Sequence, residues 1–338
     1  MSELRKDPVT GRWVIIGSSW TGNLSFSAAT RPPEAGTCPF CPGNEGKTPP
    51  EVLAYREPGT PANGPGWSVR VFPNRSPVLQ VEGKLNPRGI GVFDMMSGVG
   101  ANEVFVETPE HGKSLHQMSE TQIEKVFWAY RDRILDLERD RRLRCILVFK
   151  NYGWEAGSLL AHPHSQLIAL PIVPKVVIEE LKGARRHFQI KERCIFCDMI
   201  RQELERESRL VAQNEHFLGF TPYASRFPFE AWLLPKRHEA NFTCTSKEEM
   251  ADFARLLKVV LATHSRSLGD PPYNYLLHTK PSWVANGEEG KAVGDFYHWH
   301  LEIVPRLMRL VGFESGSGLY LNPTPPEEAA ARLREGLV

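Results

Sequence analysis

The same order of cysteines and histidines occurs twice along the chain. In each half a Cys-x-x-Cys pair is followed by a single histidine and then by a His-x-His motif. The residues are Cys38, Cys41, His111 and His162 in the first half, and Cys194, Cys197, His238 and His298 in the second. A capping-box pattern begins eight residues after each single histidine, at Ser119 and Ser246. A chain of 338 residues is about twice as long as one typical domain, so we predict two related units.

Hydrophobic periodicity predicts the same secondary structure in both halves. Behind Ser119 and Ser246 apolar residues recur at helical spacing, which predicts one principal helix per half. Short runs of β-forming residues follow each helix and carry the His-x-His motifs. This pattern favours an α+β fold of two tandem repeats, each a mostly antiparallel sheet with a principal helix. We expect an N-terminal half over residues 1–174 and a C-terminal half over 190–338, with a solvated helix in the Lys- and Arg-rich segment 175–193 between them.

The two Cys-x-x-Cys pairs are typical of structural zinc sites. Each pair supplies two thiolates to one ion, and two histidines complete a tetrahedral set. We predict one site from Cys38, Cys41, His111 and His162, and a second from Cys194, Cys197, His238 and His298. A redox turn is the alternative for either pair taken alone, and the repetition of the whole pattern disfavours it. Because four protein ligands leave no open position, both ions would stabilise the fold rather than act on a substrate.

Charge and hydropathy disfavour several classes of function. The 41 Lys and Arg residues balance 40 Asp and Glu residues, for a formal net charge of +1. This balance disfavours a zinc module that binds nucleic acid, and it disfavours an anionic membrane surface as a partner. No apolar run is long enough to span a membrane, and the N-terminus lacks an apolar signal core. We therefore expect a cytoplasmic protein.

His164 is the candidate nucleophile. Alternate residues of a strand point to the same face, so His162, His164 and Gln166 should project together. If His162 binds zinc, His164 stands beside a rigid anchor. A neutral imidazole can attack phosphorus through one nitrogen while the other donates to a backbone carbonyl, and Gln166 would contact the phosphoryl oxygens. Pro163 cannot donate to a ladder, which fits an edge or an irregular strand, and an edge strand would leave His164 accessible.

The segment ahead of this strand is suited to a phosphate or ribose site. Gly157 permits close backbone approach, while Asn151 and Ser158 offer short polar side chains. A simple hairpin connection is the alternative reading of the same residues. His278 lies on a later predicted strand, where it either lines the site or packs in the core.

These motifs resemble the galactose-1-phosphate uridylyltransferase family, a branch of the histidine-triad superfamily whose members carry two related halves. The resemblance runs along nearly the whole chain, and His-Pro-His-Ser-Gln at 162–166 is its most specific motif. The other segments that carry it are LRKDPVTGRWVII (4–16), CPFCPGNEGKTPPEV (38–52), VFPN (71–74), FPFEAWLLPKRH (227–238), HWHLEIVPR (298–306) and VGFE (311–314).

Membership of this family would imply a ping-pong reaction through a covalent histidine. His164 would attack the α-phosphorus of UDP-glucose, release the sugar 1-phosphate and pass the uridylyl group to galactose 1-phosphate. Gln166 matches the residue that contacts the transferring phosphoryl group, and the first cysteine and histidine set matches the zinc ligands. Asn74 and Asn151 fall at nucleotide-side positions, and Glu314 falls at a sugar-side position. The resemblance also implies a homodimer with sites built partly across the interface.

Several positions differ from the best-known bacterial members of the family. The second Cys-x-x-Cys pair and the segment 312–323 are closer to the branch of plant ADP-glucose phosphorylase. Arg75 stands where an aspartate commonly follows the nucleotide-side asparagine, and Leu159 stands where a serine is usual. The alternative reading is therefore an ADP-glucose phosphorylase that uses His164 and passes an adenylyl group to phosphate. A nucleotide-phosphate hydrolase, with water as the acceptor, is a third reading.

Overall fold

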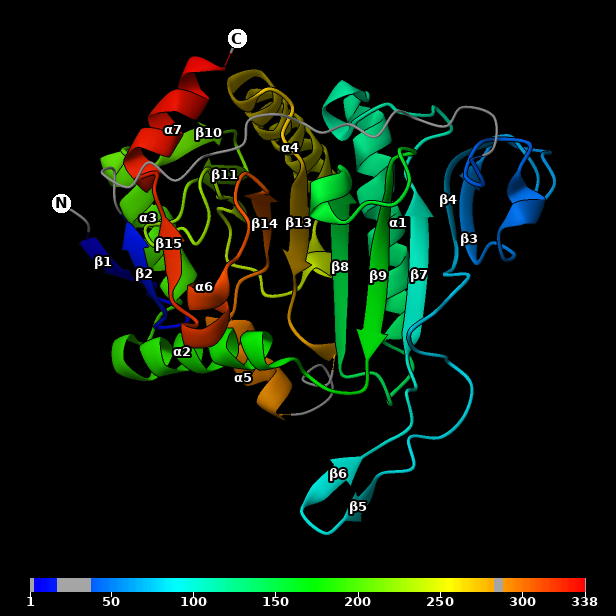
Figure 1. The fold of residues 1–338 in the computed structure, drawn as a ribbon, viewed down its shortest axis with the longest axis horizontal. Coiled ribbons are helices and arrows are strands. Elements are labelled where there is room, and N and C mark those ends of the chain that lie inside the picture. The colour runs from blue at the N-terminus through cyan, green and yellow to red at the C-terminus, as the bar shows by residue number, and fades with distance from the viewer. Residues whose placement is uncertain (1–2, 17–37, 283–287, 338) are drawn as a thin grey trace.

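The structure is a computed structural model and describes residues 3–16, 38–282 and 288–337. Its centre is one ten-stranded sheet in which neighbouring strands are antiparallel throughout (Figure 1). The strands lie in the order β10 (Leu210–Gln213), β11 (Phe217–Phe220), β12 (Ala231–Pro235), β14 (His300–Pro305), β13 (Tyr273–His278), β8 (Cys145–Tyr152), β9 (His164–Leu170), β7 (Ala101–Val106), β4 (Trp67–Pro73) and β3 (Leu53–Arg56).

The order of strands in one half of the sheet mirrors the order in the other. From the middle outward, β8, β9, β7, β4 and β3 correspond to β13, β14, β12, β11 and β10. The halves join at the pairing of β8 with β13, where Tyr152 lies opposite Tyr273 and Val148 opposite Leu277. The predicted α+β fold of two related, mostly antiparallel halves is confirmed. Because β9 and β14 run in opposite directions, His164 and His300 begin their strands at opposite ends of the sheet (Figure 1).

Two principal helices, α1 (Glu120–Leu137) and α4 (Lys247–Leu268), pack side by side against the back of the sheet. They begin as predicted, because the side chain of Ser119 accepts a hydrogen bond from the Gln122 N–H and that of Ser246 from the Glu249 N–H. Phe127 of α1 meets Phe253 of α4 edge to face, with ring centroids 4.8 Å apart. The two halves therefore share one hydrophobic core.

The front of the C-terminal half is covered by additional elements (Figure 1). The segment predicted as a solvated helix forms α2, and its buried Val177 and Ala184 show that one face packs inward. A small sheet brings the N-terminal hairpin next to a C-terminal strand. These elements are α2 (Lys175–Lys191), α3 (Ile195–Arg206), α5 (Glu288–Phe296), α6 (Gly312–Ser317), β1 (Glu3–Lys6), β2 (Trp13–Ile16) and β15 (Tyr320–Asn322). Helix α7 (Pro326–Glu335) packs instead against α4 and the edge strand β10. Short 3-10 turns span Glu45–Lys47, Leu115–Gln117, Trp154–Ala156 and Phe242–Cys244.

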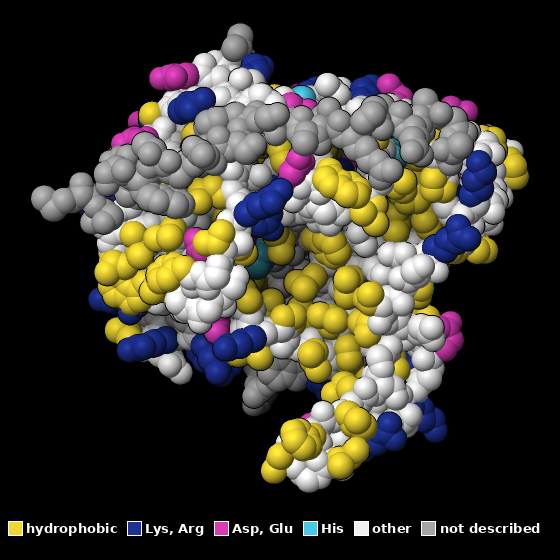
Figure 2. All heavy atoms as spheres, viewed as in Figure 1, with side chains coloured by type: hydrophobic (Ala, Val, Ile, Leu, Met, Phe, Trp, Pro, Cys, Tyr) yellow, Lys and Arg dark blue, Asp and Glu magenta, His cyan; other side chains and the backbone are white. Residues whose placement is uncertain are grey.

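A hairpin of β5 (Arg88–Ile90) and β6 (Phe93–Met95) projects from the body of the molecule (Figure 1). Its tip carries exposed hydrophobic side chains, including Val92 at 90% and Phe93 at 72% relative exposure. Figure 2 shows hydrophobic side chains at this tip and over the front of the N-terminal strands. Within the described residues, no helix combines the length and the apolar character that crossing a membrane requires.

Candidate active site and metal centres

The first predicted metal set comes together at one end of the N-terminal half. Cys41 Sγ lies 3.3 Å from His111 Nδ1 and 3.5 Å from His162 Nδ1, and Cys38 Sγ lies 3.7 Å from His162 Nδ1. The four ligand atoms all lie within 4.8 Å of one another. The cysteines precede the turn at Glu45–Lys47, while the histidines follow β7 and precede β9. Distant segments of the chain therefore meet in a set of two sulfur and two nitrogen donors.

The second predicted set forms the same arrangement in the C-terminal half. Its ligand atoms all lie within 4.8 Å of one another and belong to Cys194, Cys197, His238 and His298. Cys197 Sγ lies 3.3 Å from His238 Nδ1. In three ligand histidines the far ring nitrogen is held by a backbone carbonyl oxygen at 2.7 to 2.8 Å: His162 by Thr108, His238 by Gly294 and His298 by Pro235.

This orientation suits metal binding. Because a carbonyl oxygen only accepts, Nε2 carries the proton and Nδ1 faces the sulfurs with its lone pair. The Nε2 atom of His111 is buried and has no hydrogen-bond partner among the described residues. Both donor sets fit a tetrahedral metal ion, as the sequence predicts.

His164 is the first residue of β9, next to this first cluster. The prediction of an edge strand is wrong, because β9 lies between β7 and β8. Pro163 precedes the strand, so the ladder does not need the N–H that proline lacks. Instead, the Pro163 carbonyl oxygen accepts a hydrogen bond from the Glu107 N–H at 3.1 Å. His164 is mostly buried and keeps 9% of its surface exposed.

The protonation of the His164 ring is set by its own backbone. Its Nδ1 lies 2.8 Å from the carbonyl oxygen of His162, so Nδ1 carries the proton and Nε2 keeps its lone pair. Burial lowers the pKa of His164 to about 4, and the ammonium of Lys150 acts in the same direction. The ring is therefore neutral at pH 7.

Aromatic side chains pack around the ring of His164. The ring of Phe40, from within the first Cys-x-x-Cys pair, lies edge to face with His164 at 5.3 Å between centroids, and Phe40 meets Phe72 of β4 at 5.5 Å. Sequence analysis did not assign Phe40 a role, although Phe196 occupies the same position in the second pair. Gln166 follows His164 on the same face of β9, opposite Val104 and Phe149.

The structure places the predicted nucleotide-side residues around this strand. Asn151 of β8 accepts a hydrogen bond on Oδ1 from Asn274 at 2.7 Å, which leaves its amide nitrogen free to donate. Gly157 has a φ of +88°, which favours glycine, and lies next to Asn151, whose Nδ2 would make an ordinary contact of 3.6 Å with an added Cβ. Ser158 donates to the Leu160 carbonyl oxygen at 2.9 Å. Asn74 directly follows β4 and hydrogen-bonds the Asn102 carbonyl oxygen through its backbone N–H.

Glu314, the predicted sugar-side residue, lies elsewhere in the chain. It belongs to α6, in front of the C-terminal strands (Figure 1). Its carboxylate accepts a hydrogen bond from the Val311 N–H at 3.2 Å and so caps its own helix. Its one described hydrogen bond therefore does not link it to the strand of His164.

An open cleft of about 630 Å³ lies beside the first cysteine pair. It is lined by Pro39, Gly46, Lys47, Thr48, Pro49 and Arg75. Lys47 and Arg75 give it a positive lining, while the carboxylates nearby in sequence are engaged elsewhere: Glu45 accepts from Trp67, and Glu51 accepts from Arg70. The cleft is therefore suited to a phosphorylated ligand.

Comparison with known proteins assigns the chain to a family. The model of the galactose-1-phosphate uridyl transferase N-terminal domain matches residues 2–174, and that of the C-terminal domain matches residues 147–335. The chain belongs to the galactose-1-phosphate uridyl transferase family. This confirms the resemblance seen in the sequence and the prediction of an enzyme of this class.

Similar members of the family carry two different names. The chain is 35% identical to an ADP-glucose phosphorylase of Arabidopsis thaliana, over 98% of this chain and 92% of the relative. It is 34% identical to a galactose-1-phosphate uridylyltransferase of Thermotoga maritima, over 99% of this chain and 98% of the relative. A crystal structure of the Arabidopsis thaliana ADP-glucose phosphorylase with bound ADP-glucose superposes with a TM-score of 0.83 at 33% identity, covering 99% of both chains.

The C-terminal half of this family member holds a buried counterpart of the His164 site. Glu180, His278, His300 and Glu302 bring their ligand atoms within 4.8 Å of one another, and all four side chains are buried. The ring of His278 stacks on that of His300 at 4.5 Å, and its Nδ1 lies 3.1 Å from Glu180 Oε2. Although burial alone would lower it, the two carboxylates raise the pKa of His278 to about 9. His278 is therefore a charged member of a buried network.

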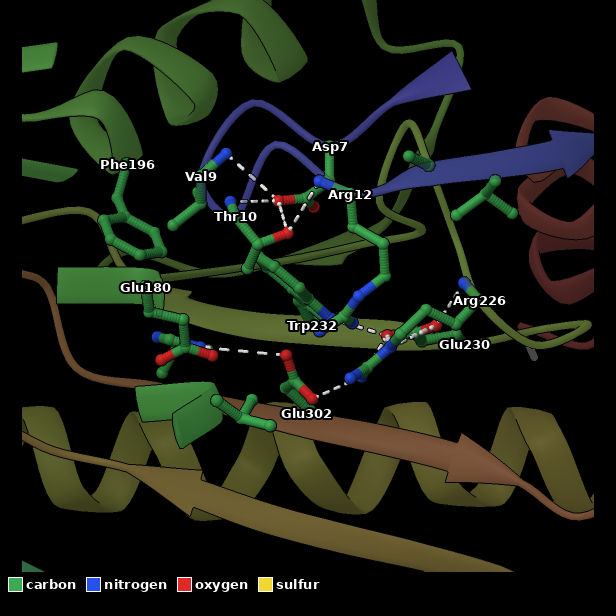
Figure 3. Close-up of a pocket in the computed structure, with 14 residues that line it drawn as sticks. Asp7, Val9, Thr10, Arg12, Glu180, Phe196, Arg226, Glu230, Trp232 and Glu302 are labelled. Atoms are coloured by element: carbon green, nitrogen blue, oxygen red, sulfur yellow. Dashed lines mark hydrogen bonds and ion pairs between the residues drawn. The ribbon is translucent and has the colours of Figure 1, made fainter. Parts of the chain in front are cut away.

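The counterpart pocket is closed by the N-terminal hairpin (Figure 3). The Asp7 carboxylate accepts hydrogen bonds from Val9 and Thr10 within the hairpin, and the side chain of Arg12 extends from it over the pocket. On the opposite side of the pocket the Glu302 carboxylate binds Arg226. The remaining cavity encloses about 20 Å³, roughly the room that one water needs. His300 has no exposed surface. Among the described residues, His164 is thus the histidine of the two His-x-His motifs that lies outside the cysteine clusters and keeps some exposed surface, 9% against 0% for His300.

Proposed function

We propose that the protein is a nucleotidyltransferase that moves a uridylyl group from UDP-glucose to galactose 1-phosphate through a covalent bond to His164. The observation that carries the proposal is the hydrogen bond from His164 Nδ1 to the His162 carbonyl oxygen at 2.8 Å. This bond directs the lone pair of Nε2 away from the backbone. It also supports the positive charge that the ring acquires when Nε2 forms a bond to phosphorus.

The first half-reaction exchanges one bond at phosphorus for another. The lone pair of His164 Nε2 attacks the α-phosphorus, an N–P bond forms, and the bond from phosphorus to the oxygen bridging to the β-phosphate breaks. Glucose 1-phosphate leaves with that electron pair. In the second half-reaction a phosphate oxygen of galactose 1-phosphate attacks the same phosphorus, the N–P bond breaks, and UDP-galactose leaves while His164 returns to the neutral state.

The neighbouring residues supply binding and orientation in this proposal. Gln166 donates its side-chain amide to the phosphoryl oxygens, and Asn151 donates the amide that its contact with Asn274 leaves free. Gly157 and Ser158 form the wall over the phosphates, and Asn74 lies on the nucleotide side. The positive cleft beside Lys47 and Arg75 attracts the phosphorylated substrates.

The proposal includes two structural zinc ions, one in each half of the chain. Cys38, Cys41, His111 and His162 would hold one ion in the N-terminal half, residues 1–174. Cys194, Cys197, His238 and His298 would hold the other in the C-terminal half, residues 190–338. A zinc ion with four protein ligands cross-links the segments that bind it and supplies no Lewis acid to the substrate. His162 then fixes the carbonyl oxygen on which the His164 ring depends.

A homodimer is part of the same proposal. Glu314 lies on α6 in front of the C-terminal strands and its carboxylate bonds within that helix, so in this proposal its sugar-side role belongs to a site completed by a second copy. The projecting hairpin supports association, because its exposed Val92 and Phe93 would be covered in a dimer. Size-exclusion chromatography with light scattering measures the mass directly, and a monomer at micromolar concentration would remove this part.

The second candidate function is an ADP-glucose phosphorylase. It uses the same covalent step, but an adenylyl group bonds to His164 and inorganic phosphate accepts it to give ADP. The similar Arabidopsis thaliana relative favours this reading, as does the second cysteine pair.

One mass-spectrometry experiment tests both functions. The protein is mixed with UDP-glucose or with ADP-glucose, without an acceptor, and the intact mass is measured after quenching. A uridylyl adduct on the peptide that contains His164 supports the first function, and an adenylyl adduct supports the second. Absence of any adduct with either donor would refute the covalent route. Continued loss of the donor without an acceptor would identify a hydrolase.

A further inference from the structure

A buried ion pair lies directly behind the strand that carries His164. Lys150 Nζ is 2.6 Å from Glu107 Oε2, and the two side chains are 1% and 0% exposed. Lys150 Nζ also donates to the carbonyl oxygen of His164 at 3.1 Å. The function proposed above gives these two charged residues no task.

Three successive carbonyl oxygens of the motif are held by specific donors. The His162 oxygen accepts from the His164 ring, the Pro163 oxygen from the Glu107 N–H, and the His164 oxygen from Lys150 Nζ. Lys150 contacts this backbone through its side chain and Glu107 through its main-chain N–H, whereas the Glu107 carboxylate binds Lys150. The ion pair between Lys150 and Glu107 therefore links β8 to the end of β7, and Lys150 also links β8 to the start of β9.

The surroundings of the pair are polar as well as buried. Ser165, the next residue of β9, accepts a hydrogen bond from the Tyr130 hydroxyl, which also contacts the Tyr275 hydroxyl. The Glu107 Oε1 atom is buried without a hydrogen-bond partner among the described residues. Burying two ions in this way incurs a desolvation cost that a well-packed apolar pair avoids. The arrangement is therefore poorly explained by stability alone.

The closed counterpart pocket lacks the lysine. In the C-terminal half, β13 places Leu277 opposite Leu301, which follows His300 as Ser165 follows His164. Leu277 is buried at 1% exposure. The charged donor is thus present behind His164, which keeps 9% of its surface exposed, and is replaced by an apolar residue behind the fully buried His300.

We propose that Lys150 and Glu107 are positioning residues for His164: Lys150 holds the His164 carbonyl oxygen so that the ring stays in line for attack, and the Glu107 carboxylate holds Lys150 in place. The proposal rests on the function proposed above. Because neither residue reaches the substrate, their loss should slow formation of the covalent adduct and leave KM unchanged. A displacement of about 1 Å at a reacting atom lowers a rate on the order of 10²-fold.

The test compares two double variants that both remove the charges. Lys150→Met/Glu107→Met removes the donor to the His164 carbonyl oxygen, whereas Lys150→Gln/Glu107→Gln keeps an amide donor. The rate of adduct formation is measured in a single turnover with the donor that labels the wild-type protein. We expect the Met variant to be slower by about 10²-fold, and the Gln variant to regain most of the rate. A merely structural pair would lower stability without this difference between variants.

The control is another buried ion pair, formed by Glu103 of β7 and Arg133 of α1. Arg133 Nη2 lies 2.6 Å from Glu103 Oε1, and neither residue contacts the His162–His164 segment in the described structure. Arg133→Met/Glu103→Met should keep the wild-type labelling rate.

The outcomes separate this inference from the function on which it rests. A folded Lys150→Met/Glu107→Met protein that labels at the wild-type rate would overturn the positioning role alone. A wild-type protein that no donor labels would overturn the proposed function and this inference with it. Should the Met variant not fold, Lys150→Met/Glu107→Gln replaces it in the same comparison, with the same expected loss of rate.

Discussion

Removing one ligand from each cysteine cluster should have different effects on catalysis. Cys38 and Cys194 occupy the same position in the two halves and are equally buried, at 5% and 4% exposure. Each serine variant should lose metal from its own cluster and lower stability, because a thiolate ligand becomes a neutral hydroxyl. Only Cys38→Ser should also slow nucleotidyl transfer, since Cys38 Sγ lies 3.7 Å from His162 Nδ1 and His162 supports the ring of His164.

The expected size of the effect follows from the contacts of His162. Its carbonyl oxygen fixes the His164 ring at 2.8 Å, and its own ring is held between the sulfurs and the Thr108 carbonyl oxygen. If loss of the ion lets this residue move by about 1 Å, the rate should fall on the order of 10²-fold. That factor corresponds to about 2.7 kcal/mol in the activation free energy. The second cluster includes His298, and the pocket of the adjacent His300 is closed, so Cys194→Ser should keep the wild-type rate constant.

The assay combines three measurements on each variant. Elemental analysis gives zinc per chain, urea unfolding gives stability, and single-turnover mass spectrometry gives the rate of adduct formation. A Cys38→Ser protein that has lost its metal but labels at the wild-type rate would show that the ion does not position His164. Equal loss of labelling in both variants would show that the clusters act through global stability instead.

Three further predictions concern the nucleophile, the shared core and the N-terminal hairpin. His164→Ala should abolish adduct formation and turnover while zinc content and the urea midpoint stay unchanged, and an active variant would contradict the covalent route. Phe127→Ala should cost about 3–5 kcal/mol in urea unfolding and keep a single transition, whereas two transitions would show that the halves unfold separately. Gly183→Ala should lower the melting temperature, although alanine normally favours a helix by about 1 kcal/mol, because an added Cβ would lie 1.5 Å from the Val9 carbonyl oxygen; a raised melting temperature would contradict this contact.

The repeated order of residues made the metal clusters and the two-part fold predictable. The spacing within a Cys-x-x-Cys pair is local, so one turn of chain places both sulfurs. The distant histidines could be assigned because each half repeats the other, and the capping serines Ser119 and Ser246 confirmed the alignment of the halves. Strand periodicity alone placed the His164 side chain next to that of His162, because periodicity needs no knowledge of the partner strands.

What the sequence did not predict depends on the register between strands. The contact of Phe40 with His164 and the pairing of Lys150 with Glu107 join residues from different strands and loops. The edge-strand prediction drawn from Pro163 was wrong for a related reason. Its missing N–H excludes it from a central ladder only inside a strand, and β9 begins one residue later. Glu314 could be matched to the motif VGFE, but no local sequence pattern predicts which pocket α6 lies beside.

The two halves each have a cluster of two cysteines and two histidines but differ at the adjoining pocket, and the difference can be traced to paired positions. Opposite Gln166 the neighbouring strand has Val104, whereas opposite Glu302 it has Trp232. The indole of Trp232 stacks on His300 at 5.1 Å, where a ligand would need to lie, and Glu302 binds Arg226 rather than presenting a neutral amide. A carboxylate there would also repel a phosphoryl group. The C-terminal pocket is therefore both filled and of the wrong charge for a nucleotide, and of the two corresponding histidines we expect only His164 to react.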